Sequence, residues 1–212
     1  MSLLDISITL RPDTPEWPGD TPFSCGWTWE MASGDSVNVS TITMSPHVGT
    51  HADAPLHVKH GAAASDALPL DAFVGQAVVL DVSGASGLLD RAALRAAGLH
   101  ATPARLLLKT GRSIAHGAFP DAWPALTASC AAALAADGLV LLGVDSPSVD
   151  ARESKSLDVH HALFDGDAQI LENLNLSQVV GGIYDLIAVP VKLGGLDAAP
   201  VRAVLRHTYG GA

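Results

Sequence analysis

The chain has 212 residues, 48% of them apolar, and carries 12 Lys and Arg against 22 Asp and Glu, a formal net charge of −10. This charge would repel a nucleic-acid backbone, and no apolar run approaches the roughly 20 residues of a membrane span, so neither nucleic acid nor a membrane is an expected partner. The length predicts one domain over residues 1–212, and two widely spaced cysteines together with an N-terminus unlike a signal peptide predict a cytoplasmic protein.

The first third of the chain alternates strand-like segments with loops. Residues 4–10 show the period-two alternation of a strand. A Pro-rich loop is expected over 12–22, because proline and glycine interrupt regular structure there. Aromatic and β-branched residues predict strands over 23–31 and 37–44. Prolines and glycines make regular structure improbable over 45–70.

The remaining two thirds mix buried-type strands with short helices. A helix over 88–97 is expected to end at Gly98, a residue suited to close a helix. An Ala-rich helix is expected over 125–136, and a short helix is expected to begin near 156. Strands are predicted over 77–82, 105–109, 139–144, 170–174, 182–192 and 201–208. The sum is a mixed α/β fold with more strand than helix.

Histidines concentrate in one irregular segment. Four of the nine histidines, His47, His51, His57 and His60, fall within 14 positions, and Asp53 lies among them. A lone histidine is usually a surface or hydrogen-bonded residue, but imidazole and carboxylate groups together suit Zn²⁺ or Mn²⁺. Pro46 and Pro55 disfavour a helix, whereas a turn at Gly49-Thr50 could bring the rings of His47 and His51 together. The segment therefore predicts part of a metal site.

Distant residues must complete such a site. The candidates are His160 or His161, and Glu172, which lies in the apolar run Ile170-Leu171-Glu172-Asn173-Leu174. A carboxylate there is costly to bury unless it is paired or metal-bound. The pattern leaves open both the choice between the two histidines and an outward-facing position for Glu172.

The segment from His47 to His57 also resembles a known signature. It matches the His-x-Gly-Thr-His-x-Asp-x-Pro-x-His pattern of the metal-dependent cyclase/formamidase superfamily, and within it the bacterial kynurenine formamidases. The similarity continues through residues 15–20, 143–148, 156–160, 171–174 and 182–190. One departure is Val58, where a larger residue is expected, and this could alter the shape of the substrate pocket.

The resemblance implies a fold, a ligand set and an assembly. It implies a swivelling β/β/α single domain that forms a homodimer and binds two divalent cations, zinc with manganese as the alternative. His47, His51 and Asp53 would bind one ion and His160 the second, with Asp53 and Glu172 shared between the two. It also implies His57 as general acid and base, and Trp17 as the aromatic contact for the substrate ring.

The implied reaction is hydrolysis of N-formyl-L-kynurenine to L-kynurenine and formate, a step of tryptophan catabolism. Two cations sharing a water would lower its pKa so that hydroxide is available near neutral pH, and a histidine could move the protons. The alternatives are an isatin-type ring-opening amidase on the same scaffold and a non-catalytic metal-binding module. Arg11, Lys59 and Arg112 are open candidates to pair with the carboxylate of the substrate.

Overall fold

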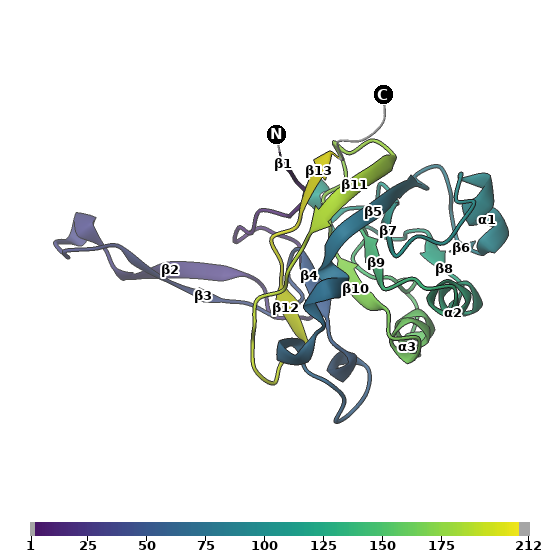
Figure 1. The fold of residues 1–212 in the computed structure, drawn as a ribbon. Helices are drawn as coiled ribbons and strands as arrows, with labels where there is room; N and C mark the ends of the chain where they lie inside the picture. The colour runs from purple at the N-terminus through teal and green to yellow at the C-terminus, as the bar shows by residue number, and fades with distance from the viewer. Residues whose placement is uncertain (1–2, 208–212) are drawn as a thin grey trace.

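The computed structural model describes residues 3–207, which build a large mixed sheet with helices on one face (Figure 1). The sheet has nine strands in the order β1-β13-β11-β5-β7-β9-β10-β4-β12. Their bounds are β1 Leu3–Asp5, β4 His51–Asp53, β5 Val74–Asp81, β7 Arg105–Lys109, β9 Leu141–Val144, β10 Gln169–Glu172, β11 Gly182–Ile187, β12 Ala198–Pro200 and β13 Val204–His207.

The centre of the sheet is parallel and its margins are antiparallel. Strands β5, β7, β9 and β10 run parallel to one another, whereas β11, β13 and β1 continue one side and β4 and β12 the other with antiparallel pairing. The register of β10 on β4 sets Glu172 opposite His51 and Ile170 opposite Asp53. Two segments more than a hundred residues apart in sequence therefore place the side chains of His51 and Glu172 next to each other.

Side chains alternate between two apolar cores, one on each face of the sheet. Leu106 and Leu108 of β7 belong to the core under the helices, and Leu107 belongs to the opposite core. On β10, Ile170 faces the helices and Leu171 the opposite core. This period-two alternation is what a sheet covered on both faces requires. The helices are α1 Arg91–Ala96, α2 Ala128–Ala136 and α3 Asp158–Asp165, with short 3₁₀ turns at Met31–Ser33, Pro55–His57, Ser65–Ala67, Leu70–Phe73 and Ile114–His116.

Two small ribbons accompany the main sheet. Strands β6 (Leu88–Leu89) and β8 (Ala125–Leu126) pair in parallel. Strands β2 (Ser24–Trp29) and β3 (Val39–Thr43) form an antiparallel arm that projects away from the body of the molecule (Figure 1). Every residue of both arm strands is exposed, so within the described chain this arm has no covering layer.

The prediction of a strand-rich mixed α/β fold is confirmed, and several boundaries change. The strand expected over 4–10 ends at Asp5. Two residues later, the hydroxyl of Ser7 donates to the Ala203 carbonyl, so a side-chain hydrogen bond replaces the backbone pairing of a strand. The expected irregularity of 45–70 is wrong over β4, a fully buried strand of the main sheet. Strand β12 was not predicted. Thr208, at the end of the last predicted strand, lies outside the described residues.

None of the helices between residues 3 and 207 has the length and hydropathy needed to cross a membrane.

Candidate metal centre

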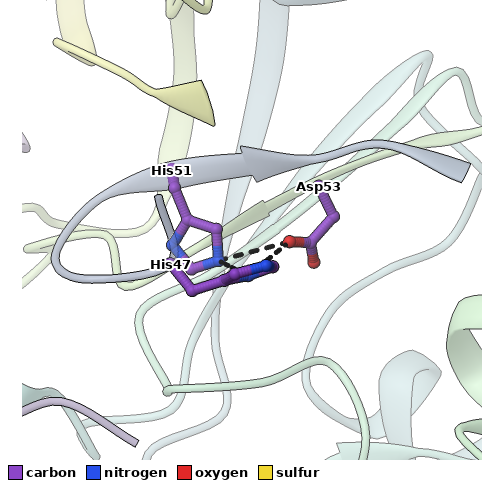
Figure 2. A group of neighbouring side chains, drawn as sticks. All are labelled: His47, His51 and Asp53. Carbon is purple, nitrogen blue, oxygen red and sulfur yellow. Dashed lines mark hydrogen bonds and ion pairs between the residues drawn. The ribbon is translucent and has the colours of Figure 1, made fainter. Parts of the chain in front are cut away.

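A turn and a short strand bring the first three candidate ligands together. Gly49 has a φ of +73°, a left-handed conformation that glycine adopts without strain, and the chain then enters β4 at His51. The Nδ1 atom of His51 lies 2.8 Å from the carbonyl oxygen of Gly49, which fixes the ring over the turn. The turn expected at Gly49-Thr50 is therefore present, and it points both rings toward Asp53 (Figure 2).

Three ligand atoms form a small triangle. His47 Nδ1 lies 3.2 Å from His51 Nε2 and 3.1 Å from Asp53 Oδ1, and His51 Nε2 lies 3.3 Å from the same oxygen (Figure 2). A tetrahedral ion with ligands at about 2.0 Å has ligand–ligand edges of roughly 3.3 Å. The triangle thus has the size of one face of a zinc coordination sphere.

A second group shares Asp53 with the first. Asp53 Oδ2 lies 3.2 Å from His160 Nε2, which lies 3.4 Å from Glu172 Oε1. The other carboxylate oxygen of Glu172 lies 3.6 Å from His51 Nε2, so Glu172 also reaches the first group. Asp53, His160 and Glu172 are all buried. The arrangement offers two adjacent cation positions with two carboxylates between them.

Each candidate histidine has its outer ring nitrogen bonded to an acceptor. His51 Nδ1 faces the Gly49 carbonyl, His160 Nδ1 lies 2.7 Å from Asp150 Oδ2, and His47 Nε2 lies 3.0 Å from an Asp197 oxygen. An acceptor takes the N–H of a neutral imidazole, which leaves the lone pair on the inner nitrogen. Acceptors of this kind typically orient metal-binding histidines.

The electrostatics of the protein alone also fit a cation. Asp53 Oδ1 is buried and has no hydrogen-bond donor among the described residues, although three histidines surround the carboxylate. Burial opposes charge on His47, but the hydrogen bond with Asp197 and the nearby carboxylate of Asp53 outweigh it and raise the pKa of His47 to about 10. Burial likewise opposes charge on His160, while Asp150, Asp53 and Glu172 raise its pKa well above the usual value. Two buried carboxylates thus attract positive charge, which protons or metal ions can supply.

His57 lies beside both groups without joining either. Its ring centroid is 4.4 Å from that of His47 and 5.7 Å from that of His160, and 29% of its side chain is exposed. His57 Nδ1 and His47 Nε2 approach the same oxygen of Asp197, at 3.5 and 3.0 Å. His47, His57 and Asp197 could also be considered as a third cation site. A neutral imidazole has one lone pair, however, so His47 cannot bind an ion with His51 and Asp53 and a second ion beside Asp197. Asp197 therefore acts best as a hydrogen-bond acceptor.

A cavity of about 380 Å³ opens above these groups. Its size lies within the usual range of small-molecule sites. Trp17 lines the cavity, with its ring edge-on to Phe119 at 5.4 Å and to Trp123 at 6.1 Å between centroids. His47, His51, His57, His160 and Glu172 also line it, so a bound molecule would contact the candidate ligands. The structure thus brings together every residue predicted for the site, from four separate parts of the chain.

Other sequence candidates lie elsewhere. His160, not His161, belongs to the group with Asp53. His60 is exposed, and Val58 packs against the core under the helices, so neither lines the cavity. Arg11, Lys59 and Arg112 do not line it either, and Lys59 pairs with Asp165 on the surface.

Sequence reasoning missed Asp150 and Asp197. Both lie outside the histidine-rich segment, and Asp197 follows the flexible-looking Gly194-Gly195 pair. Asp150 lies well before α3, whose N-cap is Leu157, so no capping pattern in the sequence marked it. Asp150 nevertheless accepts hydrogen bonds from the backbone of Val159 and His160.

Comparison with known proteins gives the chain a family. The family model described as "Putative cyclase" matches residues 4–151. The chain belongs to the cyclase family. This cyclase-family chain is 45% identical over 207 residues to a kynurenine formamidase of Bordetella pertussis (strain Tohama I), covering 97% of this chain and 98% of the relative.

Solved structures show the same cyclase-family fold. A "predicted metal-dependent hydrolase" from Bacillus stearothermophilus is 27% identical with a TM-score of 0.81, covering 96% of this chain and 97% of that one. Isatin hydrolase A from Labrenzia aggregata is 24% identical with a TM-score of 0.82, covering 98% and 94%. The resemblance seen in the sequence is therefore confirmed for both family and fold.

Proposed function

We propose that this chain is a metal-dependent amidohydrolase that converts N-formyl-L-kynurenine to L-kynurenine and formate. The observation that carries the proposal is the pair of ligand groups sharing Asp53 beneath the cavity. Identity of 45% over nearly the whole length of a kynurenine formamidase supports this substrate. The main sheet incorporates strands from Leu3 to His207, which supports one hydrolase domain.

The residues fit two divalent cations, zinc being the first candidate and manganese the second. His47, His51 and Asp53 would hold one ion, and Asp53, His160 and Glu172 the other, with Glu172 reaching both. The donor set consists of imidazole and carboxylate, which suits both metals. When bound, such ions lower the pKa of a water and polarise the formyl carbonyl.

The protein's own side chains would orient the substrate and move the proton. Trp17 offers a ring edge or face to the aryl group at the cavity wall. His57 is free of the ligand groups and can accept a proton as water adds to the formyl carbon. It can then donate that proton to the anilide nitrogen as the C–N bond breaks, releasing the amine and formate.

The nearest alternative is an isatin-type ring-opening amidase, since isatin hydrolase A shares the fold. The deciding experiment compares kcat/KM for formylkynurenine, formanilide and isatin with the metal-loaded protein. We expect formylkynurenine to be the best substrate. A value for formylkynurenine no better than for the other two would contradict the proposed substrate.

A non-catalytic metal-binding module is the remote alternative. Structural zinc sites are closed and rich in cysteine, whereas the groups here open into a cavity and contain none. Glu172→Ala should lose metal occupancy and activity together. Full metal content with no activity toward any amide in the unaltered protein would favour the non-catalytic alternative.

The arm formed by β2 and β3 supports a homodimer. Trp27, Trp29, Met31 and Ile42 on this arm are 54–60% exposed. An isolated two-stranded ribbon is only marginally stable in water, and such an apolar cluster is typical of an interface. We propose that a second copy of the chain covers the arm.

Cys25 on the same arm and the buried Cys130 are both free thiols, which suits the proposed cytoplasmic location.

Sedimentation velocity tests the assembly. The double variant Trp27→Asp, Trp29→Asp should sediment as a monomer, whereas the wild type and the control Leu88→Asp should sediment as dimers. Leu88 is 63% exposed and lies outside the arm, so Leu88→Asp also replaces an exposed apolar side chain by a carboxylate but leaves the arm unchanged. A monomeric wild type, or a dimeric arm variant, would contradict the proposed interface.

A further inference from the structure

Two oppositely charged side chains line the cavity without a partner. Glu16 lies in the loop that carries Trp17, and Lys155 lies in the segment between β9 and α3. Within residues 3–207, neither charged group forms a hydrogen bond or an ion pair, either with the other or with a third residue. Both charges are therefore available to a molecule bound in the cavity.

The other cation that lines the cavity, Arg152, is already engaged, and so is one oxygen of the acid Asp20. The guanidinium of Arg152 bonds to Asp121 at 3.0 Å and to the Pro120 carbonyl at 3.3 Å, and it lies over the Phe119 ring. An oxygen of Asp20 accepts the backbone N–H of Thr21 at 2.6 Å. Arg152 thus supports the aromatic wall, which leaves Lys155 as the free cation among the described lining residues.

We propose that Lys155 and Glu16 bind the zwitterionic amino-acid head of the substrate. Lys155 would hold the α-carboxylate and Glu16 the α-ammonium, while the formamide lies over the ligand groups. This inference rests on the proposed function and deepens it, because it assigns the residues that separate formylkynurenine from neutral amides.

The chemistry of the cavity favours this assignment. A zwitterion carries the two charges that the wall complements, and a hydrogen bond to a charged group gains more than a neutral one. The rings of Trp17 and Phe119 line the cavity, and Trp123 packs behind them, so the charged head would bind beside an apolar surface suited to the aryl ring. Isatin and formanilide lack a zwitterionic head, so they would leave both side chains unpaired and gain nothing from them.

Three substrates distinguish the contact of Lys155 with the carboxylate from the contact of Glu16 with the ammonium. Formylkynurenine carries both charges, 4-(2-formamidophenyl)-4-oxobutanoate carries only the carboxylate, and 2-formamidoacetophenone carries neither. The variants are Lys155→Met and Glu16→Gln, with Lys192→Met as the matched control. Lys192 is exposed and does not line the cavity. Calorimetric binding of L-kynurenine provides a readout independent of turnover.

Lys155→Met should lower kcat/KM about 10–100-fold for the two carboxylate substrates and leave 2-formamidoacetophenone unchanged. Glu16→Gln should affect formylkynurenine alone, and each variant should weaken L-kynurenine binding while Lys192→Met does not. Equal losses on all three substrates, or no loss on formylkynurenine, would overturn the inference while the proposed function stands. A wild type that hydrolyses none of the three would overturn both.

Discussion

Replacing Asp150 by Asn should weaken binding of the cation that we propose His160 holds. One carboxylate oxygen of Asp150 accepts the His160 ring N–H at 2.7 Å and its backbone N–H at 3.1 Å, and the other accepts the backbone N–H of Val159 at 3.1 Å. Asparagine retains only one oxygen, so an amide NH₂ would face an N–H donor of His160 or Val159. With the amide toward the ring, the imidazole must turn or carry its proton on Nε2, which removes the lone pair aimed at the metal position.

The expected loss is about 10–100-fold in affinity for this ion, or roughly 1.4–2.7 kcal/mol. The assay is competition for zinc against a chromophoric chelator, with metal per chain measured by mass spectrometry. The control is Asp158→Asn, an exposed residue in the first turn of the same helix. Circular dichroism checks that α3 persists. A fully folded Asp150→Asn protein holding two ions with wild-type affinity would refute the assignment of this carboxylate.

Three further outcomes are expected. His57→Ala should keep both metal ions and lower kcat by about 10²–10⁴-fold; normal turnover would remove it as the proton carrier. Because its carboxylate partners raise the pKa of His47 to about 10, the metal-free site holds a proton that a cation must displace. Metal affinity should therefore rise with pH, by up to about tenfold per unit for each proton displaced, and a flat profile between about pH 6 and 8 would contradict this. Gly49→Ala should cost about 1–2 kcal/mol of stability, measured by thermal unfolding, because φ is +73° and the added methyl meets Leu10. Gly84→Ala, which meets nothing within 4 Å, is the control.

Local patterns predicted the parts of the fold that depend on neighbours in sequence. The strand over 105–109 was predicted with its observed bounds, because a short apolar run between charged ends has the length of a buried strand. Strand β4 escaped prediction because its three residues follow a glycine turn and precede Pro55. Strand β12 also escaped prediction, because it includes Pro200 and proline usually argues against a strand. It lies at the edge of the sheet, where the missing N–H of proline is tolerated.

The candidate metal site was likewise predicted in part from local sequence and in part not. The turn at Gly49 and the neighbouring candidate ligands followed from spacing and residue type, whereas the family resemblance implied which ion each would bind. The choice of His160 over His161 required the family resemblance, since both occupy one short helix. Asp150 and Asp197 went unrecognised because an acceptor behind a metal ligand is defined by three-dimensional position and has no fixed spacing in sequence.

The pairing of β4 with β10 would give the proposed ions a role in folding as well as in chemistry. His51 and Asp53 face the metal groups while Ala52 between them belongs to an apolar core, as does Leu171 beside Glu172. Sliding either strand by one residue would push acids into hydrocarbon and present Ala52 or Leu171 to the cations. The two proposed ions would bind only the correctly aligned sheet, and binding to that alignment would stabilise it by mass action. Metal binding would therefore stabilise the correct register of β4 on β10 against shifted registers.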